Sequence, residues 1–379
     1  MANRPRVVVL GAGFGGLELS TILSEAMADA VAVTLIEQAD AFVFGFSKLD
    51  VMFGLERPDA VRMPYSRFNK PGVRLLRETI TAIDPAARRV TTNRGTHEAD
   101  VLVIALGATY DASATPGLVI GRNEFYSVEG ATYLRDVLPK FTHGHAIVGL
   151  CGAPYKCPPA PAECALMLHD QLLARGVRDD CTISIVHALP SPVPPSPETS
   201  SNLLAAFAER GIGYTPSQFV TSIGAKSVTL DDGRELPCDL FLGIPKHRAP
   251  DVVIAAGLTD AKGWVTVNPQ TLATPFPGVY AIGDVAHTAG APKAGVFAEG
   301  TARTVAANLI STFHDEEPTA KYPGAGSCYI EFGGERIARV DVDFFSGPKP
   351  TGTFHEPSIA LRADKTKFAA LRRERWFRL

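Results

Sequence analysis

The start of the chain constrains its fold most, because it combines a strand, a glycine-rich turn and a helix in one order. Residues 6–10 read Arg-Val-Val-Val-Leu, an apolar run typical of a buried parallel strand. Gly-Ala-Gly-Phe-Gly-Gly follows at 11–16 and opens a leucine-rich helical pattern. A second apolar run, 32–36, ends in Glu37, about 20 positions beyond the last glycine. This order predicts an adenine dinucleotide whose pyrophosphate lies at the helix N-terminus and whose ribose binds the Glu37 carboxylate.

Two later segments indicate which dinucleotide is bound. Residues 271–286, Thr-Leu-Ala-Thr-Pro-Phe-Pro-Gly-Val-Tyr-Ala-Ile-Gly-Asp-Val-Ala, resemble the closing motif of the two-dinucleotide-binding flavoproteins. In that motif the aspartate binds the ribityl chain, and Asp284 is the matching residue. Residues 101–107, Val-Leu-Val-Ile-Ala-Leu-Gly, resemble the strand and glycine that lead out of the FAD domain in the same superfamily. The order of these pieces predicts FAD.

The patterns predict an α/β fold with two Rossmann-like dinucleotide-binding domains of the disulfide-oxidoreductase type and a small C-terminal α+β part. The expected parts are the first segment of the FAD domain (1–108), a crossing linker (109–142), a second Rossmann-like domain (143–245), the second segment of the FAD domain (246–310) and the C-terminal region (311–379). Periodicity predicts helices at 162–175, 203–210 and 296–309, and strands at 146–150 and 182–187.

The second Rossmann-like segment carries an altered glycine turn. Residues 147–157 read Ile-Val-Gly-Leu-Cys-Gly-Ala-Pro-Tyr-Lys-Cys, and two more prolines follow. A pyridine nucleotide needs close approach of the backbone at such a turn, which proline rings and thiols obstruct. We therefore expect a sulfur site here in place of a nicotinamide site.

The altered turn also resembles a known group of flavoproteins. Residues 156–161, Lys-Cys-Pro-Pro-Ala-Pro, are similar to the cysteine signature of sulfide:quinone oxidoreductases and of the flavoprotein subunit of flavocytochrome c sulfide dehydrogenase. Residues 327–329, Ser-Cys-Tyr, resemble the second redox cysteine of that family. Residues 292–298 resemble its Lys-Thr-Gly segment, with Ala294 in place of the threonine, so the hydroxyl of that segment is missing here.

The resemblance implies that Cys157 and Cys328 form a redox pair beside the flavin. Hydrosulfide would attack the disulfide or sulfur-bridged pair and produce a persulfide, and the electrons would pass to the flavin. From the residues alone the alternative of two unrelated buried cysteines stays open, because they lie far apart in the sequence. Cys151, at the mouth of the same turn, is a candidate to hold or relay a sulfur chain.

Charged residues near these motifs are further candidates. Glu163 lies in the first turn of the following helix, where it either takes the proton from hydrogen sulfide or interacts favourably with the helix dipole. Lys293 is expected at the pyrimidine edge of the flavin, where a cation stabilises the reduced form. Lys156 is expected to be a solvated or structural charge. No cysteine or histidine cluster has metal-ligand spacing, so no metal is predicted.

FAD is expected to bind without a covalent link, because no cysteine precedes Cys151. The expected cofactor-binding residues belong to the glycine-rich turn, to the ends of strands and to the loop before a long helix. They are Gly11, Gly13, Phe14, Gly15, Gly16, Glu37, Ile80, Gly107, Gly283, Asp284, Lys293, Gly295 and Val296.

Composition and the two ends of the chain bear on partners and location. A net charge of −3 argues against nucleic acid as a partner. The sequence has no run of about 20 apolar residues, so no spanning helix is predicted. The first strand begins too early for a signal peptide, so we expect a cytoplasmic location.

Residues 365–379 place Trp376 and Phe377 beside arginines, which is typical of a peripheral anchor on the inner face of the cell membrane or of a helix docked on the protein itself. Assembly into a homo-oligomer is left open.

The interpretation that unites these features is an FAD-dependent oxidation of sulfide to polysulfide or sulfur, with a quinone as electron acceptor. Tyr329, Phe344 and Phe345 are aromatic candidates for the quinone slot, with ordinary core packing as the alternative for each. Three alternatives remain: a sulfide dehydrogenase flavoprotein with a cytochrome acceptor, a type II NADH:quinone oxidoreductase, and a flavoprotein that binds persulfide as a sensor without turnover.

Overall fold

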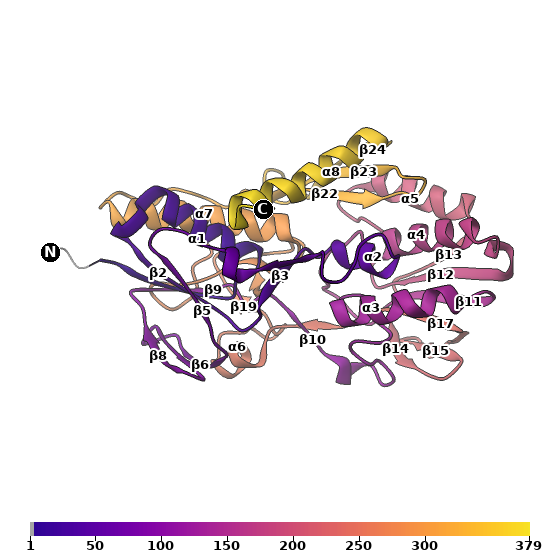
Figure 1. Cartoon of the computed structure of the whole chain (residues 1–379), viewed down its shortest axis with the longest axis horizontal. Coiled ribbons are helices and arrows are strands. Elements are labelled where there is room, and N and C mark those ends of the chain that lie inside the picture. The colour runs from indigo at the N-terminus through magenta and orange to yellow at the C-terminus, as the bar shows by residue number, and fades with distance from the viewer. Residues whose placement is uncertain (1–3) are drawn as a thin grey trace.

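The first sheet joins strands from the beginning of the chain with one strand from its second half. The computed structural model describes residues 4–379. Five parallel strands form this sheet, and across it they are β20 (Val279–Ala281), β9 (Val101–Ile104), β1 (Arg6–Leu10), β2 (Ala32–Glu37) and β5 (Val73–Arg77). The four apolar residues of β1 are buried, as expected for a strand covered on both faces. Helices α1 (Phe14–Met27) and α7 (Gly295–Phe313) pack against each other beside this sheet (Figure 1).

Shorter elements surround the first sheet. They are β3 (Ala41–Val43), β4 (Arg62–Pro64), the antiparallel strands β6 (Ile80–Asp84), β7 (Arg89–Thr92) and β8 (Gly95–Glu98), then α6 (Asp251–Ala255), β19 (Val265–Thr266) and β21 (Ala286–His287). Helix α2 (Ser47–Met52) lies farther away and packs against α3 (Val128–Val137) (Figure 1).

A second parallel sheet lies at the other end of the molecule (Figure 1). Its strands, in order, are β13 (Ile212–Pro216), β12 (Cys181–His187), β11 (Gly144–Leu150) and β17 (Leu240–Ile244). It is accompanied by α3 (Val128–Val137), α4 (Ala160–Ala174), α5 (Pro197–Glu209), β14 (Val220–Ile223), β15 (Ser227–Leu230) and β16 (Glu235–Pro237). The chain enters and leaves this part through β10 (Thr109–Tyr110) and β18 (His247–Arg248), which pair antiparallel.

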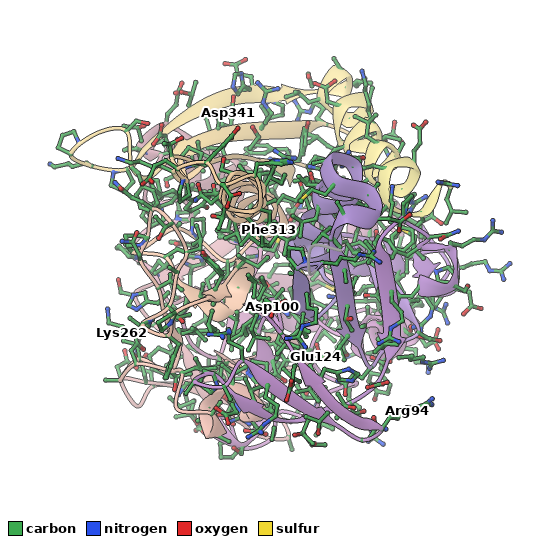
Figure 2. The ribbon with its side chains drawn as sticks, turned by 90° about the vertical axis from the view of Figure 1, so that its left-hand side faces the viewer. Arg94, Asp100, Glu124, Lys262, Phe313 and Asp341 are labelled. Atoms are coloured by element: carbon green, nitrogen blue, oxygen red, sulfur yellow. The ribbon has the colours of Figure 1, made fainter. Side chains whose placement is uncertain are left out.

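The C-terminal part spans both of these regions. Strands β22 (Ala325–Glu331), β23 (Ile337–Asp343) and β24 (Thr351–Ser358) form an antiparallel sheet, followed by α8 (Ile359–Arg372) and a last turn, Arg373–Phe377. In Figure 1 this part runs along the top of the molecule, and Figure 2 shows the sheet, which carries Asp341, covering the same side. Strand β22 contacts both α4 and α7, so it brings Cys328 between the two sheets.

The α/β fold class with two dinucleotide-binding-type sheets is confirmed. Each helix expected from periodicity forms, although α5 begins six residues before position 203. Ser196 explains this earlier start, because its hydroxyl accepts the N–H of Thr199 and Pro197 occupies the first helical position.

The C-terminal tail docks on the protein itself. Trp376 and Phe377 are both buried, and the guanidinium of Arg375 pairs with Glu18 and Glu25 on α1. Trp376 and Phe377 thus follow the docked interpretation of this tail, and their rings do not face outward. Across residues 4–379 no helix combines the length and the apolar character needed to cross a membrane.

Candidate functional site

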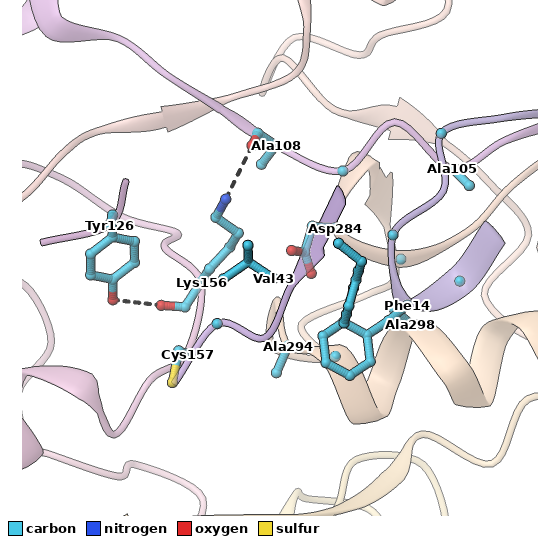
Figure 3. A pocket seen from close by; sticks show the side chains of 18 of the residues that line it. Phe14, Val43, Ala105, Ala108, Tyr126, Lys156, Cys157, Asp284, Ala294 and Ala298 are labelled. Atoms are coloured by element: carbon cyan, nitrogen blue, oxygen red, sulfur yellow. Dashed lines mark hydrogen bonds between the residues drawn. The ribbon is translucent and has the colours of Figure 1, made fainter. Parts of the chain in front are cut away.

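A cavity of about 650 Å³ lies where the two parallel sheets and the C-terminal part meet. Its wall is built from the glycine-rich turn after β1, the ends of β2 and β9, helix α2, the cysteine turn after β11, the start of α7, strand β22 and helix α8. Figure 3 shows this wall from close by, with the cysteine turn on one side and Asp284 on the other.

The glycine-rich turn closes one end of the cavity by tight backbone packing. A Cβ on Gly16 would lie 1.9 Å from the carbonyl oxygen of Gly11, and a Cβ on Gly11 would lie 2.5 Å from that of Ala105. Gly13 has open space at its Cβ position and lines the cavity. The Glu37 carboxylate accepts the N–H of Ala12 at 3.0 Å, which fixes it at the end of β2. This cradle fits a ribose and a pyrophosphate, as the sequence predicts.

The cofactor-binding prediction can be compared residue by residue with the cavity wall. The wall includes eleven of the thirteen residues: Gly11, Gly13, Phe14, Gly15, Glu37, Ile80, Gly107, Gly283, Asp284, Gly295 and Val296. Gly16 lies behind the turn and supports it. Lys293 does not belong to the wall.

Lys293 points away from the cavity instead of toward it. Its ammonium donates to the backbone carbonyl of Asp284 at 2.5 Å and lies 3.4 Å from the centre of the Trp264 ring. Burial lowers the pKa of Lys293 to about 8, although Asp284 and Asp260 act in the opposite direction. The expectation that Lys293 faces the flavin is therefore corrected: a carbonyl and an indole ring behind the wall bind its charge.

Lys156, expected to be only a solvated or structural charge, reaches into the cavity (Figure 3). Its ammonium donates to the carbonyl of Ala108 at 3.2 Å and to the hydroxyl of Tyr110 at 3.1 Å. Sequence reasoning missed this residue, and its place directly before Cys157 in the altered turn is the signal that could have found it.

Cys157 and Cys328 line the same cavity although they come from distant parts of the chain. Cys157 has a positive φ of 56° and donates its N–H to the carbonyl of Lys293 at 2.9 Å. Burial raises the pKa of the Cys157 thiol, and the charges of Glu163 and Cys328 raise it further. Burial likewise raises the pKa of Cys328 to about 12. Glu163 raises the pKa of both thiols, so the two cysteines share the influence of one buried acid.

The remaining cysteines lie outside the cavity wall. Cys151 is buried in a separate apolar cluster with Leu118, Ile147 and Val186, and burial raises its pKa to about 12. This placement separates Cys151, a candidate to hold or relay a sulfur chain, from the cavity that Cys157 and Cys328 line. Three further cysteines are also buried outside the cavity wall: Cys164, Cys181 and Cys238.

Glu163 joins the two cysteines in the cavity wall and is 1% exposed. Its carboxylate accepts the backbone N–H of Glu331 at 3.1 Å, so it bridges α4 and β22. Burial raises the pKa of Glu163 to about 7, although Lys365 opposes this shift. A carboxyl group with such a pKa beside two thiols can accept and release a proton near neutral pH.

The other end of the cavity is aromatic. Tyr329 and Phe46 each pack on Phe368, with ring centroids 6.0 and 6.4 Å apart, and all three line the cavity. Lys365 lies among them, bonded to the Glu331 carboxylate at 2.5 Å and 5.1 Å from the centre of the Phe46 ring. Burial lowers the pKa of Lys365, but Glu163 and Glu331 outweigh it and raise the pKa above the ordinary value.

Two of the aromatic candidates lie elsewhere. Phe344 packs on Phe297 and Phe345 on Tyr322, and neither lines the cavity, whereas Tyr329 does. Sequence reasoning missed Phe46 and Phe368, which no motif distinguishes from core phenylalanines. Within the described part of the chain, no group of three or more His, Cys, Asp or Glu side chains is arranged to hold a metal ion.

Comparison with known proteins defines the family. Residues 5–307 match the family described as pyridine nucleotide-disulphide oxidoreductase. The chain belongs to this family. Its members are FAD-binding flavoproteins, which agrees with the predicted cofactor and with the cradle at the glycine-rich turn.

Individual relatives of this family match most of the chain. The mouse mitochondrial sulfide:quinone oxidoreductase is 24% identical over 372 residues, covering 93% of this chain and 81% of that protein. The sulfide-quinone reductase of Aquifex aeolicus is 26% identical over 363 residues, covering 86% and 81%. The X-ray structure of the sulfide:quinone oxidoreductase from Aquifex aeolicus superposes with a TM-score of 0.87 at 24% identity, covering 98% of this chain and 91% of that one, which shows the same fold.

Proposed function

We propose that this flavoprotein oxidises sulfide at Cys157 and Cys328 and delivers the electrons to a quinone. The observation that carries the proposal is that the structure brings both cysteines and Glu163 into one cavity with the dinucleotide cradle. The names of the mouse and Aquifex relatives support the same substrate pair. When bound, FAD supplies a carrier that accepts two electrons from sulfur and returns them to the acceptor.

Several residues of the cavity wall would hold the cofactor. The Glu37 carboxylate would hold the adenosine ribose, and the backbone at Gly13 would approach the pyrophosphate. Asp284 would bind the ribityl hydroxyls, and the N-terminus of α7 at Gly295 would face the flavin. These side chains bind and orient the cofactor, while the packed rings around Phe14 exclude water from it.

The cysteine pair carries out the sulfur chemistry. In the oxidised pair, hydrosulfide attacks the S–S bond, so that bond breaks and a new S–S bond forms as a persulfide on one cysteine. The other cysteine leaves as a thiolate. The proton of the attacking hydrosulfide passes to the Glu163 carboxylate, the buried base of the cavity wall.

The aromatic end of the cavity suits a flat apolar acceptor. The rings of Phe46, Tyr329 and Phe368 offer stacking surfaces, and the Lys365 ammonium beside them offers a hydrogen bond to a quinone oxygen. Since native quinones reside in membranes, we place membrane contact on α8, which exposes the apolar side chains Ile359 and Leu371, and not on the buried Trp376.

The choice of electron donor tests the proposal. Anaerobic sulfide should bleach the bound flavin rapidly, and a soluble quinone such as decylubiquinone should restore its colour. NADH and NADPH should leave the flavin oxidised, because Pro154 and Cys157 occupy the turn that would otherwise cradle a second pyrophosphate. Stoichiometric bleaching by NADH would overturn the proposal and favour an NADH:quinone oxidoreductase.

A further inference from the structure

We propose that Lys156 has two roles at the cofactor: it fastens the cysteine turn to the cofactor domain, and it makes the bound flavin easier to reduce. The inference rests on the proposed function in taking FAD as the occupant of the cavity. It does not depend on sulfide as the donor.

The contacts of Lys156 connect the two halves of the cavity. Its side chain starts in the turn after β11 and ends at Ala108 and Tyr110, which belong to the segment that leaves the first sheet. Its own carbonyl accepts the hydroxyl of Tyr126 at 2.7 Å (Figure 3). Because Cys157 is the next residue, these bonds also help to hold its backbone in place.

The charge of Lys156 is not neutralised by a direct ion pair. Its partners are a carbonyl oxygen and a phenol, and among residues 4–379 no carboxylate lies within ion-pair distance of its ammonium. Burial lowers the pKa of Lys156 below its ordinary value, and the charge of Asp284, on the opposite wall, opposes this shift only in part. Of the other lysines, Lys365 is paired with Glu331, and the ammonium of Lys293 is held behind the wall. Lys48, on α2, also lines the cavity.

A cation at this position has a direct effect on reduction. A flavin that takes up two electrons and one proton gains one negative charge, whereas the oxidised ring is neutral. An ammonium in a cavity of low dielectric constant stabilises that added charge more than it stabilises the neutral form. Lys156 should therefore raise the reduction potential of the bound cofactor, the role that the sequence assigned to Lys293.

The test compares Lys156→Met, Lys156→Gln and Lys156→Arg with the unaltered protein, each loaded with FAD. Midpoint potentials are measured by reduction with dithionite against a reference dye, so a failure of sulfide as donor would leave this test intact. We expect the methionine and glutamine variants to favour the oxidised flavin at least tenfold more, about 30 mV for two electrons. The arginine variant should keep most of the original potential.

Glutamine separates the two roles, because it keeps a donor but has no charge. The affinity for FAD and the circular dichroism spectrum of each variant report whether the turn is still fastened. Lys140→Met, which removes an exposed lysine, controls for overall charge. A glutamine or methionine variant that binds FAD with an unchanged potential overturns the electrostatic role, and unchanged FAD affinity in the methionine variant overturns the fastening role.

Discussion

The indole ring of Trp376 meets the ring of Phe14 edge to face, with 5.7 Å between the ring centroids. Phe14 belongs to the glycine-rich turn and lines the cofactor cavity, whereas Trp376 lies near the end of the chain. The indole N–H also donates to Glu18 on α1 at 2.9 Å. The C-terminal tail therefore forms a second layer behind the wall that holds the cofactor, and cofactor binding and tail docking should stabilise each other.

Replacing Trp376 by alanine tests this coupling. The substitution removes a fully buried ring and leaves Glu18 without one donor, so it should lower the free energy of unfolding by about 3–5 kcal/mol. It should also weaken FAD binding at least tenfold, since Phe14 loses its support. Thermal unfolding with and without added FAD measures both effects. Leu379→Ala, at a half-exposed position in the same tail, should change neither. Reduced stability with unchanged FAD affinity would contradict the coupling.

Alanine substitutions at two glycines of the same turn should have different effects, one on stability and the other on FAD binding. Gly16→Ala places a Cβ 1.9 Å from the Gly11 carbonyl oxygen, so the contact between strand and helix must open and the protein should lose stability even without cofactor. Gly13→Ala meets no protein atom within 4 Å, but its methyl group enters the cavity. This variant should fold normally and bind FAD poorly. Denaturation of the apoproteins and FAD titrations distinguish the two, and normal FAD binding by Gly13→Ala would contradict the assigned approach of the pyrophosphate.

The sequence predicted the parts of this site whose geometry is local. The turn at Gly11–Gly16, the carboxylate of Glu37 and the position of Asp284 depend on a few neighbouring residues, so a motif specifies them. The pairing of Cys157 with Cys328 came from resemblance alone, because contact between residues so far apart depends on how β22 packs between the sheets.

The directions of long side chains could not be predicted. Lys156 and Lys293 lie on adjacent strand-like segments that form a bridge, yet one ammonium enters the cavity and the other leaves it. The partners that decide this, Ala108 and Trp264, come from other parts of the chain. The tail has the composition of an interfacial helix. Its arginines instead pair with two buried acids, Glu18 on α1 and Glu299 on α7, and no local sequence pattern identifies these acids as partners.

Glu163→Gln tests the proposed proton acceptor. Only the deprotonated carboxylate can take a proton, and its pKa of about 7 means that this form becomes populated as the pH rises through neutrality. Sulfide-driven flavin reduction by the unaltered protein should therefore accelerate from about pH 6 to pH 8. In the glutamine variant the rate should fall about 100-fold, and only the pH dependence of hydrogen sulfide itself should remain. Stopped-flow absorbance at several pH values provides the measurement. An unchanged rate would leave the interaction with the helix dipole as the role of Glu163.

Glu163→Gln should slow flavin reduction but should increase the stability of the fold above neutral pH. Because burial raises the pKa of Glu163 from 4.5 to about 7, its contribution to stability is present in full below about pH 4.5 and is lost as the pH rises through about 7. Glutamine stays neutral and keeps an oxygen for the N–H of Glu331. Above pH 7 the variant should thus be more stable than the unaltered protein by up to about 3 kcal/mol, and below pH 4.5 the difference should vanish. Urea denaturation above pH 7 and below pH 4.5 measures this difference in the free energy of unfolding. A difference that does not change with pH would contradict the raised pKa of Glu163.

The cysteine pair gives the last prediction. Cys157→Ser and Cys328→Ser should each abolish sulfide-dependent reduction of decylubiquinone, because a hydroxyl forms neither a disulfide nor a persulfide. Both variants should still fold and bind FAD. Because the two cysteines act as one catalytic unit, the double variant should have the same residual rate as either single variant. Cys181→Ser and Cys238→Ser provide matched controls at buried positions outside the cavity wall, where a polar group costs some stability but leaves turnover intact. Rates are normalised to bound flavin. Near-normal turnover in both Cys157→Ser and Cys328→Ser would eliminate the sulfur relay, whereas loss in only one of them would retain a single reactive thiol and refute the pairing.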